Sequence, residues 1–554
     1  MIKNSDIIST KIVIILVLFS LTTIFGCDGD DWGFDLFGGD SVNGDDGNGN
    51  GNNGDGDPVE FPPAVFSANI GGTKINEPVE LFSSFDNGSD IIELTGVVRQ
   101  GGAEDEFEDE FKVSPDGTLV AYLTDQNNSR IELFVVPVDG DTETQISELL
   151  SDDAEVTEFD WSPDGIRIAY LVDGEIDGRV ELYTNLAEGG ENRKVSGSLP
   201  PGGKVEAFEW SPDSEWLAYR ADQNNLDEFE LFTTPPTESD PVKVSGNVSP
   251  INGDVEEFSW SPSSSRIAYR SNQQRANLFE LFSSLPRRRN DPDLISEGVS
   301  VQDFAWAPDE VDRSLAYSTV RIIYTARPNG DKNKQVTPDL TDGGEISDFS
   351  WAPNSTRIAY LADQITDEVF ELFTVEPDGD DDLRVSGDFD LTAGGDVTDF
   401  VWSPNSRFIA YRANQDNVIN FELYVTKPDD SSNDTKVSGD SIAGDVDPIF
   451  EWSPDSARVA YRADQRFVGD IELFTATPDG QENDRVSGDL SSGGNVGEFK
   501  WAPDDSGIGY IADQENDEVF ELFASTPDGD EKVNLSGSFA EDEDGDVLFF
   551  EWVP

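Results

Sequence analysis

Apolar and polar residues alternate in short runs along most of the chain, and each run is bounded by Pro, Asp, Gly or Ser. The stretch from Asp445 to Gly488, "DVDPIFEWSPDSARVAYRADQRFVGDIELFTATPDGQENDRVSG", shows the pattern clearly. Runs rich in β-branched and aromatic residues predict four strands here, at 449–452, 458–462, 471–476 and 484–488. Two tight turns, "SPDS" and "TPDGQ", and one longer loop, "ADQRFVGD", separate these strands. The layout indicates a unit of four short antiparallel strands.

This unit recurs through the chain, and its most regular mark is a phenylalanine and a tryptophan two residues apart, followed by a proline. Copies such as "FDWSP", "FEWSP" and "FSWAP" begin at Phe159, Phe208, Phe258, Phe304, Phe349, Phe400, Phe450, Phe499 and Phe550. An earlier copy, "FKVSP" at Phe111, has Val113 in place of the tryptophan. The copies are 45 to 51 residues apart, a period typical of propellers or repeat arrays. We therefore predict an all-β protein, a β-propeller of four-stranded blades.

The two ends of the repeat array complement each other. Residues 64–96 contain counterparts of strands two, three and four, "VFSAN", "VELFSS" and "IELTG", but no strand one. The segment "FEWVP", Phe550–Pro554, is a strand one without the rest of its unit. We expect it to complete the first blade, which gives one ten-bladed ring over residues 64–554, closed by pairing of the N- and C-terminal strands. Such a ring leaves no exposed edge strand. Two five-bladed rings are the alternative.

The repeated motifs resemble those of the WD-like propeller repeats of TolB and its relatives. The resemblance rests on "WSPDG", "IAY", "ELF" or "ELY", "PDG" and the terminal "VSG", and it covers about 490 residues. It implies the propeller fold, which many unrelated activities share. TolB-like proteins are envelope components that bind partner proteins. This chain departs from TolB, because a lipid-anchor signal stands where TolB has an N-terminal α/β domain.

The net charge limits the classes of partner that the protein can bind, and the absence of histidine limits the kinds of catalytic and metal site that it can form. The chain has 114 acidic and 36 basic residues, a formal net charge of −78. Such a surface repels phosphate groups, which argues against binding to nucleic acid and against direct attraction to anionic lipid. The sequence has no histidine and one cysteine. These absences exclude Ser-His-Asp and Cys-His catalytic sites, zinc sites built from His and Cys, and an internal disulfide.

The one cysteine lies at the end of an N-terminal export signal. Two lysines precede an apolar run from Ile12 to about Phe25, which is too short and too early for a membrane span and fits a secretory signal. The run ends in "IFGC", which resembles the lipobox of bacterial lipoproteins, where the cysteine is lipidated. We therefore expect a lipoprotein signal peptide at 1–26 and a lipid anchor on Cys27. The alternative is an uncleaved anchor with an incidental cysteine.

Residues 27–63 are predicted to be a flexible tether. Most of the stretch is Gly, Asp and Asn with few apolar residues, so it cannot bury enough surface to offset the entropy of ordering. Bound calcium is the alternative, although the acidic residues do not have the spacing of an EF-hand loop.

The residues that recur in every unit are predicted to be structural. Phe and Trp of strand one point to one face of the blade and should pack between neighbouring blades. The Asp or Asn of the "ADQ" loop should hydrogen-bond to nearby backbone and fix the turn. Strand three carries a glutamate and strand two ends in an arginine in several units, as at Glu230 and Arg220. Because these strands are neighbours, we expect ladder-like ion pairs between them.

The two faces of the predicted ring differ in their connections. Because strands alternate in direction, the loops after strands two and four share one face, and the turns after strands one and three share the other. Variable stretches such as "NNLDE" and "AGGDV" lie in the first set, so we predict that this loop face is acidic and carries the binding site.

One unit, which begins at Phe304, departs from the common pattern and is the least acidic. Its arginines and those just before it form a candidate docking patch, which consists of Arg287, Arg288, Arg289, Arg321 and Arg327. Drift in a redundant repeat is the alternative explanation.

Three classes of function fit these observations. The first is a lipid-anchored, non-catalytic binding or scaffolding propeller of the bacterial cell envelope, which faces the periplasm or the exterior and binds a protein, peptide or other envelope partner through its acidic loop face. The second is a carboxylate-based glycan-active enzyme, since pairs of Asp and Glu suffice for that chemistry. The third is a structural surface protein stabilised by cations. No cofactor is expected, and Ca²⁺ is the candidate ion.

Overall fold

In a computed structural model, the chain forms two units, Met1–Asp57 and Pro58–Pro554. The structure describes residues 59–69, 78–95, 99–100, 111–125, 130–147, 154–174, 178–247, 253–309, 314–340, 343–388, 395–416, 419–431, 434–439, 444–490, 493–514, 519–537 and 546–554. The signal peptide predicted at 1–26, the lipidation site at Cys27 and most of the predicted tether lie outside these ranges. Within them, no helix has the length and apolar content that crossing a bilayer requires.

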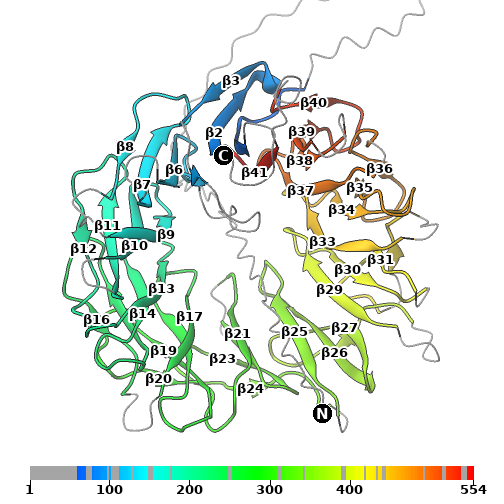
Figure 1. The fold of residues 1–554 in the computed structure, drawn as a ribbon. Helices are drawn as coiled ribbons and strands as arrows, with labels where there is room; N and C mark the ends of the chain where they lie inside the picture. The colour runs from blue at the N-terminus through cyan, green and yellow to red at the C-terminus, as the bar shows by residue number, and fades with distance from the viewer. Residues whose placement is uncertain are drawn as a thin grey trace, which may run out of the picture. The chain divides into compact units, whose positions relative to one another are not determined.

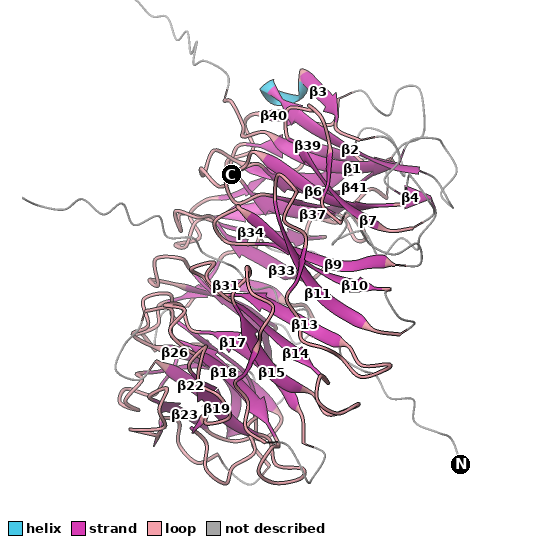
Figure 2. Cartoon of the chain, turned by 90° about the vertical axis from the view of Figure 1, so that its left-hand side faces the viewer, coloured by secondary structure: helices cyan, strands magenta, loops and turns pink. Residues whose placement is uncertain are grey.

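The described residues of the second unit form ten antiparallel sheets arranged around a ring (Figure 1). We number these sheets as blades 1 to 10 in chain order. In each blade strand one lies nearest the centre of the ring and strand four lies at its outer edge. In the side view the connections lie at the two ends of the strands, on opposite faces of the ring (Figure 2). The predicted single ring of ten four-stranded blades is therefore confirmed.

Blade 1 contains segments from both ends of the unit, in the order β3–β2–β1–β41, with β4 also paired to β2. Its elements are β1 (Ala64–Asn69), β2 (Pro78–Phe85), the short 3₁₀-helix η1 (Asp86–Gly88), β3 (Asp90–Glu93), β4 (Arg99–Gln100) and β41 (Val547–Trp552).

The other nine blades repeat one order of strands. Strand one is β5 (Phe111–Val113), β9 (Glu155–Trp161), β13 (Val205–Trp210), β17 (Val255–Trp260), β21 (Asp303–Trp306), β25 (Ile346–Trp351), β29 (Val397–Trp402), β33 (Val446–Trp452) and β37 (Val496–Trp501). Strand two is β6 (Leu119–Thr124), β10 (Arg167–Asp173), β14 (Leu217–Ala221), β18 (Ile267–Ser271), β22 (Leu315–Ser318), β26 (Ile358–Thr366), β30 (Ile409–Ala413), β34 (Val459–Ala463) and β38 (Ile508–Ala512).

The outer strands of these nine blades are strand three and the short strand four. Strand three is β7 (Glu132–Pro137), β11 (Val180–Leu186), β15 (Glu230–Thr234), β19 (Glu280–Ser284), β23 (Ile323–Ala326), β27 (Val369–Val375), β31 (Glu422–Thr426), β35 (Glu472–Ala476) and β39 (Glu521–Ser525). Strand four is β8 (Thr144–Gln145), β12 (Arg193–Lys194), β16 (Val242–Lys243), β20 (Asp293–Leu294), β24 (Lys334–Gln335), β28 (Leu383–Arg384), β32 (Thr435–Lys436), β36 (Asn483–Arg485) and β40 (Lys532–Asn534).

The ring closes through β41, which pairs antiparallel with β1. The register places Phe66 opposite Phe550 and Ala64 opposite Trp552. Phe550 is fully buried, and the Trp552 side chain is 7% exposed. The predicted closure by "FEWVP" is confirmed, and it follows from the same two-residue alternation that places strand one in every other blade.

The packed unit begins before residue 64, so the structure corrects the predicted end of the tether. Phe61 is buried in the cluster that also contains Phe550 and Trp552. Val59 and Phe61 are also tied to Asn87, because Phe61 N donates to Asn87 Oδ1 (3.0 Å) and Asn87 Nδ2 donates to Val59 O (2.7 Å). Phe61 is one apolar residue after a polar stretch, so the sequence shows no alternating pattern there that would assign it to the propeller.

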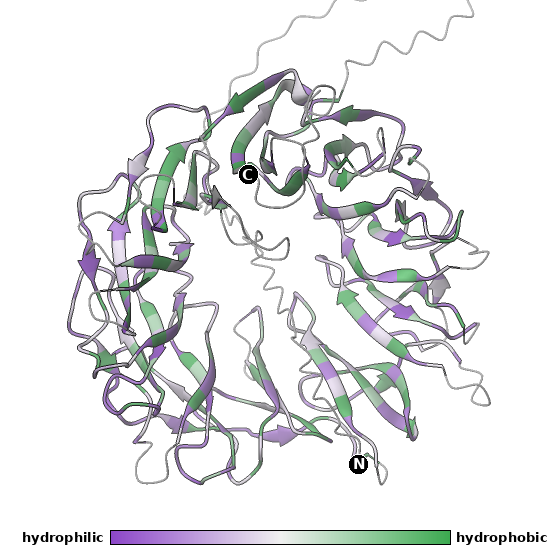
Figure 3. Cartoon of the chain, in the orientation of Figure 1, coloured by the Kyte–Doolittle hydropathy of each residue, from purple (hydrophilic) through white to green (hydrophobic). Residues whose placement is uncertain are grey.

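The core lies between adjacent blades as ten separate apolar clusters, one for each blade interface in the described part of the ring. Apolar and polar residues alternate along the strands that enclose these clusters (Figure 3). In blade 4, for example, Tyr219 stacks on Phe232 at 5.3 Å between ring centroids. This arrangement explains why the aromatic residues recur at every repeat.

The strand-one tryptophans are part of this core and also link neighbouring blades by hydrogen bonds. Trp210 is 5% exposed, and its Nε1 donates to the carbonyl oxygen of Asp160 in the preceding blade (3.3 Å). The equivalent hydrogen bond from Trp552 Nε1 to Lys500 O (3.0 Å) joins blade 1 to blade 10, where the ring closes. The predicted structural role of the repeated Phe and Trp is confirmed, since a stacked platform for ligands would require the rings to be exposed.

The "PDG" turns also fasten each blade to the one before it. Thr325 Oγ1 in β23, for example, donates to the carbonyl oxygen of Pro377 in the next blade (2.7 Å). Gly529 has φ +73°, and a Cβ atom there would lie 2.4 Å from Arg485 O of the preceding blade. The glycine of this turn is therefore required both by its backbone conformation and by the close approach of two blades.

Candidate functional site

The loop face begins with the "ADQ" loops, whose polar residues hold the loops in place. In blade 4, Asp222 Oδ1 accepts a hydrogen bond from Lys204 N (2.6 Å), and Asp222 Oδ2 accepts one from Asp227 N (3.1 Å). The next residue reaches the neighbouring blade, because Gln223 Oε1 accepts a bond from Gly197 N (2.9 Å). The predicted role of the Asp in fixing the turn is confirmed. The second role, a link between blades through Gln, was not predicted.

The repeated glutamates of strand three are buried, but their ion-pair partners differ from the prediction. Glu230 is 2% exposed and pairs with Lys243 of strand four, while Arg220 of strand two pairs with Glu206 of strand one (2.8 Å). The register explains the difference: Glu230 lies opposite Ala221, and Arg220 lies opposite Leu231. Because side chains alternate between the two faces of a sheet, Glu230 and Arg220 point to opposite sides. The expected pairs between strands two and three are therefore wrong.

Another set of carboxyl groups lies on strand one, between the Phe and the Trp of the motif, near the centre of the ring. Loss of water around the carboxyl raises the pKa of Glu209 to about 8, although a hydrogen bond from Trp260 N opposes the shift. Burial likewise raises the pKa of Glu451 to about 7 and raises that of Glu551. Glu551 Oε2 accepts a bond from Val113 N (2.7 Å), so this group also ties β41 to blade 2. These carboxyl groups lie between blades and are partly shielded from water, which favours their neutral form.

The structure divides the candidate docking patch between the two faces. Arg287, Arg288 and Arg289 follow strand β19, and Arg327 follows strand β23, so these four lie on the turn face. Arg321 precedes β23 and lies at the other end of that strand, on the loop face, where it donates to Leu340 O (2.8 Å).

The local positive charge of this patch is also partly offset. Arg288 pairs with Asp291 (2.8 Å) and Asp293 (3.0 Å), and the hydrogen bonds to these two carboxylates raise its pKa. Arg287 lies over the ring of Trp216 in the neighbouring blade, at 4.7 Å from the ring centroid. The five arginines do not form one surface.

Two open depressions lie on the turn face, on either side of Phe408. One, of about 750 Å³, lies between blades 7 and 8, and the other, of about 660 Å³, lies between blades 8 and 9. Phe408 and Lys427 line both, and the Phe408 ring stacks on Trp452 at 6.0 Å. The depressions therefore form one polar surface around a central aromatic ring.

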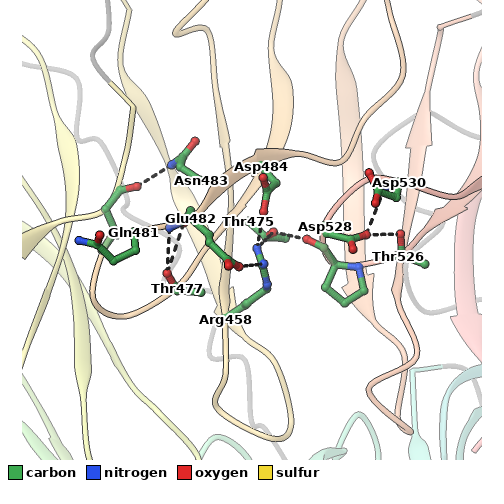
Figure 4. A network of polar contacts seen from close by, with 12 residues as sticks. Arg458, Thr475, Thr477, Gln481, Glu482, Asn483, Asp484, Thr526, Asp528 and Asp530 are labelled. Carbon is green, nitrogen blue, oxygen red and sulfur yellow. Dashed lines mark hydrogen bonds and ion pairs between the residues drawn. The ribbon is translucent and has the colours of Figure 1, made fainter. Parts of the chain in front are cut away.

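Arginines hold the acidic walls of these depressions in place. Arg357 donates to Asp381 Oδ2 (2.9 Å) and to Thr374 Oγ1 (3.2 Å). Arg458 donates to Asp484 Oδ2 (2.8 Å) and also pairs with Glu482 (Figure 4). The surface thus presents fixed acceptors and donors beside an aromatic ring, an arrangement that suits a ligand rich in hydroxyl groups. No local pattern in the sequence marks this surface, because its residues come from turns of three different repeats.

The loop face carries a row of exposed apolar side chains. Among the described residues nine large apolar side chains are exposed; five of them lie in the connections between strands two and three, and a sixth, Ile365, lies at the loop-face end of strand β26. We call these six the loop-face row: Leu226, Val320, Ile365, Ile419, Phe467 and Val468, with exposed fractions of 48% to 78%. They come from blades 4, 6, 7, 8 and 9. The sequence signal was one or two apolar residues inside each variable loop, a run too short for any periodicity.

Metal coordination has no clear site in the described ranges. No group of three or more Asp, Glu, Cys or His side chains there is placed to hold an ion. The expectation for Ca²⁺ stays a prediction.

No protein-family model matches the chain, and no curated protein sequence matches it. Among solved structures, the crystal structure of Porphyromonas gingivalis dipeptidyl peptidase 4 is similar with a TM-score of 0.46 and 13% identity, over 78% of this chain and 60% of that chain. A structure from a mechanistic study of two prolyl endopeptidases is similar with a TM-score of 0.37 and 11% identity, over 72% of this chain and 50% of that chain. This chain thus matches less than two thirds of the length of either structure, and neither similarity bears on its function.

Proposed function

We propose that this protein is a lipid-anchored, non-catalytic binding propeller of the bacterial cell envelope, which holds a partner protein on its loop face. The observation that supports this most directly is the loop-face row. Exposed apolar side chains cost solubility, and where they gather on one face of a domain they mark a surface that a partner covers. Six such side chains on one face, against two on the turn connections at Ile166 and Leu285, indicate which face the partner covers.

A binding role also fits the distribution of the acids. The carboxylates that repeat in most blades make their contacts inside the ring, as at Glu230 with Lys243 and Asp222 with the backbone of Lys204. A carboxylate enzyme needs one distinctive acid pair with different environments. The resemblance of the repeat to TolB-like propellers, whose members bind envelope proteins, points the same way.

The lipid anchor has a direct test in Cys27→Ser. We expect this variant to move from the membrane fraction to the soluble fraction, because the thiol that would carry the lipid is gone. Labelled fatty acid should be incorporated into the wild-type protein and not into the variant. If the variant stays bound to the membrane, the lipoprotein interpretation is wrong.

Partner binding is tested on the loop face itself. We expect the combined variant Ile365→Ser, Ile419→Ser and Phe467→Ser to lose a partner that chemical cross-linking captures on the wild-type protein in the native envelope. The yield should fall at least about tenfold, since central apolar contacts dominate most interfaces. The matched control, Ile166→Ser with Leu285→Ser, removes exposed apolar side chains from the turn face and should leave capture unchanged. Equal capture by both variants would contradict the proposal.

A further inference from the structure

We propose that the part of the loop-face row on blades 7, 8 and 9 binds a cationic amphipathic helix of the partner. This inference rests on the proposed function and adds the chemistry of the partner. The surface consists of Ile365, Ile419, Phe467 and Val468, which are 56%, 78%, 58% and 71% exposed. We call it the three-blade surface.

The spacing of the three-blade surface suits a helix. Blades 7, 8 and 9 are consecutive around the ring, and their strands pack against each other in the order β27 to β29 and β29 to β33 (Figure 1). Packed sheets lie about 10 Å apart. An α-helix rises about 1.5 Å per residue, so about seven residues, or two turns, span that distance. A helix with apolar residues every seven positions would therefore place one on each blade.

The acidic residues around the three-blade surface favour a partner segment with a positive net charge. Asp367, Glu368 and Asp416 are exposed beside Ile365 and Ile419, and Asp470 follows the apolar pair in blade 9. The exposed arginine of this surface, Arg466, pairs with Glu472 (2.8 Å), which it shares with Arg485, and lies over the Phe467 ring at 5.4 Å from the centroid. With a net charge of −78 on the whole chain, a cationic segment is drawn in and an anionic one is repelled.

In blades 7 and 9 hydrogen bonds hold in place the loops that carry these side chains. In blade 7 the hairpin of β26 and β27 pairs Thr366 with Val369, and Asp363 Oδ2 accepts a bond from Glu368 N (3.2 Å). In blade 9 Asp464 Oδ2 accepts a bond from Gly469 N (3.2 Å). Fixed loops lose little entropy on binding, so apolar contacts made there contribute to affinity.

Synthetic peptides of about 20 residues test the proposal on the purified full-length protein, with binding measured by fluorescence anisotropy. The first peptide is helical and lysine-rich, with leucines seven residues apart. The second replaces the leucines by serine, and the third replaces the lysines by glutamate. We expect the first to bind at least about tenfold more tightly than either of the others.

The protein variants separate specific binding from attraction to an acidic molecule. The combined variant Ile365→Ser, Ile419→Ser and Phe467→Ser keeps every charge, and we expect it to bind the first peptide at least about tenfold more weakly than the wild type. Ile166→Ser with Leu285→Ser should bind it like the wild type, and unchanged melting temperatures show that both variants fold. Equal binding by the three-residue variant, or equal binding of the glutamate peptide, would overturn the proposal. The two proposals can also fail separately. If the three-residue variant no longer captures the native partner, but the first peptide does not bind the wild type, the proposed function stands and the proposed helix chemistry is refuted.

Discussion

Deletion of Phe550–Pro554 is expected to cause a large loss of stability, because these residues supply strand one of a blade whose other strands come from the opposite end of the chain. Phe550 and Trp552 are buried, and removal of one buried aromatic side chain costs about 3–5 kcal/mol. The deletion also removes the hydrogen bonds from Lys500 Nζ to Phe550 O (2.8 Å) and from Val553 N to Pro63 O (2.8 Å). Thermal unfolding followed by calorimetry measures the effect.

The matched control is Phe159→Ala with Trp161→Ala, which removes the two equivalent, similarly buried side chains from blade 3. There strand one stays joined to strand two through a turn, so its backbone pairing with β10 can persist. We expect the deletion to lower the melting temperature more than the control does, because the deletion also opens the ring and exposes the edge of β1. An unchanged melting curve for the deletion would show that the two ends do not pair in solution.

Glu209→Gln is expected to stabilise the protein at alkaline pH and to have little effect at pH 5. The pKa of Glu209 is raised to about 8 in the folded state, from the 4.5 of an exposed glutamate. The folded state therefore holds a proton that the unfolded state has lost, and stability falls as pH rises through this window. The full shift corresponds to about 5 kcal/mol, and roughly 2–4 kcal/mol is expected because the side chain keeps some contact with water. Glutamine, which stays neutral, avoids this loss.

Melting temperatures of the wild type and of Glu209→Gln, measured from pH 5 to pH 9, give the difference directly, since the general effect of the net charge is common to both. The control Glu215→Gln changes an exposed glutamate of the same blade and removes one carboxyl group from the surface instead of from between blades. Parallel curves for Glu209→Gln and the wild type would mean that Glu209 ionises freely in the folded ring.

Much of the candidate site could not be predicted from the sequence, because it depends on strand register and on contacts between distant turns. The partner of Glu230 depends on whether residue 220 or residue 221 lies opposite it, and a shift of one residue reverses the face to which a side chain points. The candidate patch grouped Arg321 with Arg327 because they are close in sequence, yet strand β23 lies between them and carries them to opposite faces. The depressions around Phe408 combine turns from blades 7, 8 and 9, whose distance in sequence says nothing of their distance in space.

The sequence by itself determined the repeat, the four strands of each blade, the structural role of the aromatic residues and the closure of the ring by Phe550–Pro554. These features depend on the local alternation of apolar and polar residues and on turn residues. Both repeat at a fixed period, so they can be recognised in the sequence alone. Only the tertiary structure decided which carboxylates are enclosed between blades, which ion pairs form and which loops bring Ile365, Ile419 and Phe467 onto one surface. The ion pairs depend on the strand register within one blade, whereas the enclosed carboxylates and the loop-face surface depend on the packing of one blade against the next.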